Sequence, residues 1–162
     1  MGAVLTTAIA GCAGTRIDRG VFHSPKGYRI ALPGSEWMVA SESRADLELR
    51  HRSEPAGMLV NASCENRSPR STPGVLARHL LSDLRDRSVV SREDIAVDGL
   101  VGRHAVVEGR IGSEGERVKL EVYVMRDTRC VYDFIYVAPP ASFERWEPDF
   151  QRFVDTFTSE SE

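Results

Sequence analysis

The segment from Cys130 to Val137 reads Cys-Val-Tyr-Asp-Phe-Ile-Tyr-Val and is apolar at every position except Asp133. Side chains of a strand alternate between the two faces of a sheet, so this strand would bury both of its faces. Only a strand in the interior of a covered sheet can do so. The sequence therefore predicts a sheet in which this segment is a central strand.

Other segments alternate apolar and polar residues with a period of two, which is typical of half-buried strands. These segments lie at 28–32, 47–50, 58–64 and 118–124, with a further strand through 105–111. Asp98-Gly99 is a favoured two-residue hairpin turn that follows a strand beginning near Asp94. The strands are therefore expected to pair as antiparallel hairpins.

Two segments have helical periodicity instead. Thr72-Pro73 provides a hydroxyl N-cap followed by proline at the first helical position, and the apolar stripe after it predicts a helix over 73–87. Aromatic residues recur at helical spacing from Phe143 to Phe157, with Pro148 expected to kink this helix or to begin a second segment. A chain of 162 residues is long enough for one well-cored domain. We expect a single α+β domain at 21–160, an antiparallel sheet flanked by helices.

The order of these elements resembles the Mog1/PsbP-like α/β/α sandwich. The resemblance rests on Tyr-x-Ile-x-Leu-Pro beginning at Tyr28, the nearby Trp37, the Val-Asp-Gly hairpin at 97–99, and Phe-x-x-Phe-Val-x-x-Phe beginning at Phe150. It covers about residues 22–158 and includes no diagnostic motif. Small bacterial lipoproteins of unknown function share this ground plan. The resemblance implies a binding or accessory module rather than an enzyme.

The N-terminus resembles a bacterial lipoprotein signal. An uncharged apolar run starts at Ala3, is too short to span a bilayer, and ends in Ile9-Ala10-Gly11-Cys12, which looks like a lipobox. The resemblance implies a diacylglyceryl group on Cys12, with residues 1–20 as signal and tether. Because Ala13 follows, it also implies the periplasmic face of the outer membrane. No Lys or Arg precedes the run, although an export signal has a positive start. The alternative is a disordered cytosolic tail with an incidental cysteine.

Cys64 and Cys130 are the cysteines that remain if Cys12 carries lipid. In the oxidising periplasm an even number of cysteines favours a disulfide. A pair on adjacent strands can also meet the Cα separation that a disulfide requires. The alternative is two free buried thiols that pack as small apolar side chains.

Two further features are candidates for ligand contact. Asp133 is the only charged residue of the central strand, so we expect it to pair with Arg126 or Arg129, or to contact a ligand in a cleft. A cluster of arginines surrounds the start of the first helix, where it either holds an anion with the helix amides or stays solvated. This cluster consists of Arg67, Arg70 and Arg78.

The sequence contains no motif that points to a cofactor or a catalytic centre. The four histidines are too widely spaced for a metal site, and no nucleophile elbow, P-loop or dinucleotide fingerprint occurs. A net charge of -3 gives no general attraction to nucleic acid. We expect a non-enzymatic envelope lipoprotein that is held to the membrane by its lipid and binds an envelope protein or a small ligand. The alternative is a periplasmic hydrolase or another enzyme whose site is assembled from scattered residues.

Overall fold

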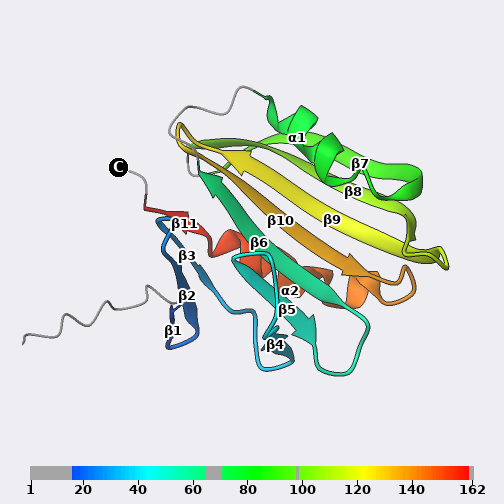
Figure 1. Ribbon diagram of the computed structural model, residues 1–162, viewed down its shortest axis with the longest axis horizontal. Coiled ribbons are helices and arrows are strands. Elements are labelled where there is room, and N and C mark those ends of the chain that lie inside the picture. The colour runs from blue at the N-terminus through cyan, green and yellow to red at the C-terminus, as the bar shows by residue number, and fades with distance from the viewer. Residues whose placement is uncertain (1–15, 65–70, 98, 161–162) are drawn as a thin grey trace, which may run out of the picture.

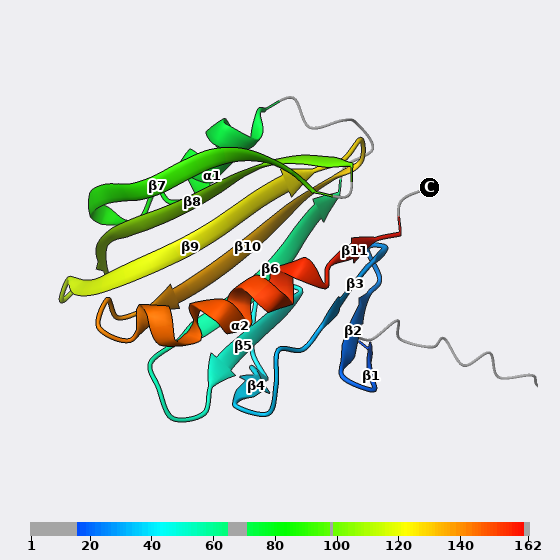
Figure 2. The ribbon, with the colours of Figure 1, turned by 180° about the vertical axis from the view of Figure 1, so that it is seen from behind.

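The computed structural model describes residues 16–64, 71–97 and 99–160, so Cys12, Arg67 and Arg70 lie outside the described residues. The main sheet is built from β4 (Trp37–Val39), β5 (Leu47–His51), β6 (Gly57–Cys64), β7 (Arg85–Val97), β8 (Leu100–Ile111), β9 (Glu116–Arg126) and β10 (Cys130–Ala138). Its strand order is β4-β5-β6-β10-β9-β8-β7, and every neighbouring pair is antiparallel. Helix α1 (Pro73–Leu80) lies on one face and α2 (Phe143–Asp155) on the other (Figures 1 and 2). This arrangement confirms the predicted α+β fold with an antiparallel sheet between helices.

Strand β10 occupies the middle of the main sheet, between β6 and β9, as its two apolar faces predict. Its residues Tyr132, Phe134 and Tyr136 are fully buried in the cluster that contains the aromatic residues of α2. The alternate residues Val131 and Ile135 belong to the smaller clusters under α1. The sheet therefore separates two hydrophobic cores, and β10 contributes to both.

Helix α2 packs on the sheet through the aromatic stripe predicted from the sequence. Phe143, Phe150 and Phe153 are fully buried, and the Tyr136 hydroxyl donates a hydrogen bond to the carbonyl oxygen of Phe143 at 2.9 Å. The helix continues through Pro148 as one segment, so a second segment does not begin there. Pro148 is exposed, and its ring therefore meets solvent rather than the sheet.

Helix α1 is shorter than the sequence predicted, because it ends at Leu80 rather than at residue 87. The chain turns there, and β7 begins at Arg85 rather than near Asp94. Leu84, which the expected helix over 73–87 would have included, is instead buried over β8, where Gly109 leaves room for it. A Cβ atom at Gly109 would lie only 2.4 Å from Cγ of Leu84. Periodicity alone could not reveal this change, since Leu84 is buried in either conformation.

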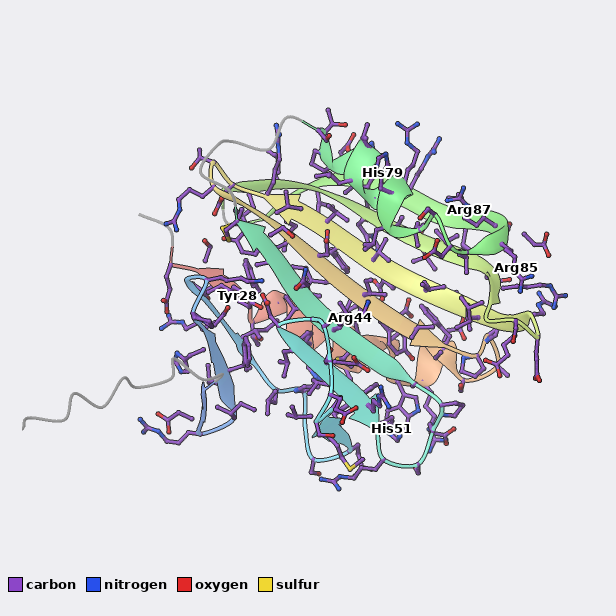
Figure 3. The ribbon with its side chains drawn as sticks, viewed as in Figure 1. Tyr28, Arg44, His51, His79, Arg85 and Arg87 are labelled. Carbon is purple, nitrogen blue, oxygen red and sulfur yellow. A yellow bond between two sulfur atoms is a disulfide. The ribbon has the colours of Figure 1, made fainter. Side chains whose placement is uncertain are left out.

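Two arginines at the start of β7 hold the turn that ends α1. The Arg87 guanidinium donates a hydrogen bond to the carbonyl oxygen of Leu81 at 3.1 Å. The Arg85 guanidinium donates to the carbonyl oxygen of Gly112 in the turn after β8. Figure 3 shows both side chains at the end of the molecule where α1 gives way to β7. The Leu81 oxygen also accepts a hydrogen bond from the backbone N–H of Leu84 at 3.2 Å, so Arg87 adds to the turn after α1, whereas Arg85 ties the start of β7 to the turn after β8.

A second, smaller sheet has the strand order β1-β2-β3-β11. Its strands are β1 (Arg16–Asp18), β2 (Val21–Ser24), β3 (Tyr28–Ala31) and β11 (Thr158–Ser159). Strand β1 falls within residues 1–20, the segment assigned from the sequence to the signal and tether. Strand β11 follows α2 and pairs with β3, so this sheet joins the two ends of the described chain.

Strand β7 forms one edge of the main sheet and is 13 residues long. Its pairing with β8 contains two register shifts, one between Arg85 and Ser88 and the other between Val89 and Ser91. Such bulges bend a strand and increase its local twist. The edge beside α1 is therefore long but irregular.

A disulfide joins Cys64 at the end of β6 to Cys130 at the start of β10. The two residues are direct partners in the antiparallel register, with their Cα atoms 4.1 Å apart. Their sequence separation of 66 residues encloses α1 and the strands β7, β8 and β9. Of the two alternatives that the sequence left open for these cysteines, the structure contains the disulfide.

Reduction of this disulfide is expected to lower the free energy of unfolding by about 4 kcal/mol, because the bridge constrains the unfolded chain. Denaturant titrations with and without dithiothreitol measure the change. Intact-mass measurement after alkylation should show both cysteines modified only when reductant is present. In the Cys64→Ser, Cys130→Ser double variant the reductant should have no effect on stability. Alkylation of both cysteines in unreduced protein would contradict the assignment.

Candidate functional site

A cleft of 370 Å³ lies between α1 and the outer strands β7 and β8. Figures 1 and 2 show the helix beside this edge of the sheet. Apolar side chains from all three elements line much of the cleft, and they are Val75, Ala77, Leu81, Val89, Ala105 and Val107. The volume is in the lower part of the range of roughly 300–1,000 Å³ that is typical of small-molecule sites.

Three arginines border the same cleft, namely Arg78 from α1, Arg92 from β7 and Arg103 from β8. The Arg103 side chain is only 26% exposed, and its Nη2 lies 2.9 Å from Oδ1 of the exposed Asp94. Its Nε is buried and has no acceptor within the described part of the chain. None of the described lining residues is acidic, so the cleft carries net positive charge.

Gly74 allows α1 to lie close to the Arg103 guanidinium. A Cβ atom at this position would lie 3.1 Å from Nη2 of Arg103. On β8, Arg103 shares a face with Ala105 and Val107, because these residues alternate with those that face the other side. The charge of Arg103 therefore lies between the helix and the sheet, above the apolar floor.

The cleft contains one of the three arginines that the sequence singled out. Arg78 borders it and is exposed, whereas Arg67 and Arg70 lie outside the described residues. Arg92 and Arg103 were not predicted. Because Arg103 and Ala105 are two positions apart on β8, the strand pattern would have placed Arg103 on the inward face. Arg92 could not be placed in this way, since only the early end of α1 brings β7 beside the helix.

Asp133 is on the α1 face of β10 and makes no ion pair with Arg126 or Arg129 within the described chain, which corrects the expectation of a structural ion pair. Arg126 instead donates to the carbonyl oxygen of Ser71 at 3.2 Å, and Arg129 is exposed. Burial raises the pKa of Asp133 to about 6. Asp133 does not line the cleft. It is therefore a partly buried carboxylate without a described cation beside it.

A network of titratable groups lies on the opposite face of the sheet, beneath α2. His104 contacts two carboxylates, with Nε2 2.8 Å from Oε1 of Glu121 and Nδ1 3.0 Å from Oε1 of Glu93. Glu121 is fully buried, and its Oε1 also accepts hydrogen bonds from the hydroxyl of Tyr123 and from Gln151. Residues scattered over three strands and a helix form this network, so no local sequence pattern predicted it.

The charged state of His104 is favoured by its partners. Burial alone would lower the pKa of His104, but the hydrogen bonds to Glu121 and Glu93 outweigh burial and raise it above the ordinary value. The imidazole ring also stacks on Tyr123, with 4.3 Å between ring centroids. Two nitrogens that each face a carboxylate match the imidazolium, which donates from both. The network is therefore a compensated, largely buried ion pair.

The chemistry of the cleft is suited to binding an anion. Guanidinium groups donate in a fixed fork that matches carboxylate and phosphate oxygens. Thr72 is the only hydroxyl among the described lining residues, and no histidine, cysteine or carboxylate accompanies it there.

Across residues 16–64, 71–97 and 99–160, no group of three His, Cys, Asp or Glu residues is placed to hold a metal ion. None of the helices described is long and apolar enough to cross a bilayer.

Comparison with known proteins identifies the fold. No protein-family model matches the sequence, and no curated protein matches it. The structure is similar to PsbP of the cyanobacterium Synechocystis, with a TM-score of 0.60 and 15% sequence identity over 93% of this chain and 98% of that one. It is also similar to LpqN of Mycobacterium tuberculosis, described as involved in cell envelope biogenesis, with a TM-score of 0.62 and 12% identity over 85% of this chain and 87% of LpqN.

A Pseudomonas aeruginosa protein of unknown function has the same architecture, with a TM-score of 0.56 and 14% identity over 83% of this chain and 91% of that one. Identities this low establish a common fold and do not transfer a function. The Mog1/PsbP-like fold expected from the sequence is therefore confirmed.

The His104 network should make the stability of the protein depend on pH. A histidine whose pKa is raised on folding stabilises the protein fully below its unfolded value of roughly 6.5, and this stabilisation is lost as pH rises through the folded value. The His104→Ala variant should lose about 3 kcal/mol at pH 6, because it leaves Glu121 buried without its partner. Chemical denaturation between pH 6 and 9 measures both effects. The exposed His79 provides the control: a His79→Ala variant with an equal loss would contradict this role.

Asp133 should have the opposite effect on stability. A carboxyl whose pKa is raised on folding carries no cost below its unfolded value, and the cost grows as pH rises through the folded value of about 6. We therefore expect Asp133→Asn to be more stable than the wild type by about 2 kcal/mol at pH 8 and equally stable at pH 3.5. Thermal denaturation at both pH values tests this, with exposed Asp83→Asn as the matched control. A destabilised Asp133→Asn at pH 8 would show that the carboxylate has a partner.

Proposed function

We propose that this chain, which has the fold of PsbP and LpqN, is a lipid-anchored binding module of the bacterial cell envelope. The observation that carries the proposal is the Cys64–Cys130 disulfide. Structural disulfides persist in oxidising compartments such as the periplasm and are rare in a reducing cytosol. A disulfide in the domain and a lipobox-like Ile9-Ala10-Gly11-Cys12 ahead of it are consistent with one another.

The position of the proposed anchor leaves the cleft accessible. Cys12 precedes β1, which begins at Arg16, by only a few positions in the sequence. Strand β1 and helix α1 lie far apart, on opposite sides of the main sheet's central strands, in both views (Figures 1 and 2). Lipid attached at Cys12 would thus hold the small sheet near the bilayer, and the cleft beside α1 would be directed away from it. The alanine at position 13 favours the periplasmic face of the outer membrane as the location.

Binding rather than catalysis is supported by where the titratable groups lie. An active site gathers acids, bases or nucleophiles with shifted pKa values in one pocket. Here the pKa shifts of His104 and Tyr123 arise beneath α2, and that of Asp133 on β10, whereas the cleft is bordered by arginines and apolar side chains. The LpqN likeness adds a neighbour of the same fold that is described as acting in envelope biogenesis.

The anchor is tested by replacing its sulfur. Wild-type chain should incorporate labelled palmitate and sediment with membranes, whereas Cys12→Ser should remain in the aqueous fraction, because two or more acyl chains give durable attachment. The Cys64→Ser, Cys130→Ser double variant is the matched control, since it loses two cysteines and keeps Cys12. Equal palmitate labelling or equal membrane partition of Cys12→Ser and wild type would remove the proposal.

A further inference from the structure

We propose that the cleft between α1 and the β7–β8 edge binds an anionic amphiphile, meaning a molecule with a carboxylate or phosphate head and an apolar body. Arg78, Arg92 and Arg103 would hold the head, and the apolar floor would accept the body. This inference names the class of ligand for the binding module proposed above and rests on that function.

The first argument is uncompensated charge. The three arginines come from α1, β7 and β8, which are separate elements, and their convergence on one cleft is a product of the fold. In the described chain, the ion pair that Arg103 makes is with Asp94, whose side chain is 79% exposed. An exposed ion pair in water contributes little, so it compensates the Arg103 charge only in part.

The second argument is an unused donor. Arg103 presents five N–H groups, and its buried Nε has no acceptor among the described residues. Leaving a buried donor unpaired destabilises the folded state, and we expect a bound anion to draw the Arg103 guanidinium into a position where this donor is paired. The adjacent Gly74 keeps the space next to the guanidinium free of a side chain.

The third argument is the apolar floor, which distinguishes an amphiphile from a simple ion. Leu81 from the end of α1, Val89 from β7, and Ala105 and Val107 from β8 lie in the same cleft as the arginines. Val89 is 54% exposed, which is high for a valine that borders a cleft. An inorganic ion would leave this apolar surface in water, whereas an alkyl chain would cover it.

The direct test is isothermal titration calorimetry with full-length chain carrying Cys12→Ser, which avoids acyl chains of its own. Dodecyl phosphate and laurate, each below its micelle concentration, are the probes with an anionic head. Decyl maltoside is the neutral amphiphile, and inorganic phosphate is the anion without an apolar body. We expect binding of the two anionic amphiphiles and at least about tenfold weaker binding of the other two, because one charge-assisted contact or the apolar floor is then lost.

Two variants assign binding to the cleft. Arg92→Gln, at an exposed edge position, should weaken dodecyl phosphate binding by about tenfold or more without unfolding the domain. Arg103→Gln should have at least the same effect. Arg50→Gln on β5, away from the cleft, is the matched control and should bind as the parent does. Unchanged affinity in both cleft variants would overturn the proposal.

The remaining outcomes are also decisive. Decyl maltoside binding as tightly as dodecyl phosphate would exclude charge recognition, and inorganic phosphate binding as tightly would exclude a role for the apolar floor. Absence of heat with every probe would remove the site. Because this assay needs no lipid on Cys12, its failure leaves the membrane anchor intact, and a failure of palmitate labelling leaves the binding result intact.

Discussion

Burying both faces of β10 requires a covering layer on each side of the main sheet, because every apolar strand face must be removed from water. Helix α2 supplies one layer with a continuous aromatic stripe, and the short helix α1 with Leu84 supplies part of the other. The disulfide fastens β10 to β6 at the strand's first residue. The three-layer architecture, with one helix on each face of the sheet, follows from this strand.

Strands β3, β5, β6, β8 and β9 were predictable because they carry a period of two, and β10 was predictable as central because Asp133 is its only charged position. The end of α1 was not predictable, since Leu84 fits a helical stripe and a buried turn equally well. The same ambiguity hid the first part of β7, because its exposed edge residues show no alternation, and with it the placement of Arg92. The pairing of His104 with Glu121 depends on the register of β8 and β9, which no local pattern encodes.

Both faces of the main sheet carry buried charged groups. Beneath α2, Nε2 of His104 and Oε1 of Glu121 lie within hydrogen-bond distance, whereas Oε2 of Glu121 is buried without a hydrogen-bond partner among the described residues. On the α1 face, the guanidinium of Arg103 retains an unused donor, and Asp133 has no cation beside it in the described chain. Groups that a fold needs only for stability are normally paired when they are buried. Buried polar atoms without a partner therefore occur on both faces of the sheet in the described chain, and the one on Arg103 belongs to a residue that borders the cleft.

The register shifts in β7 affect how readily the protein can associate through the edge of its main sheet. Strand β7 is an edge strand of 13 residues, and the backbone amides and carbonyls on its outer side could pair with a strand of another chain. The two bulges interrupt the regular spacing that such pairing needs, and Arg85, Asp86, Arg87, Arg92, Glu93 and Asp94 place charges along the strand. The bulges and charges therefore disfavour aggregation through strand addition at β7, so this edge strand can stay exposed beside the cleft.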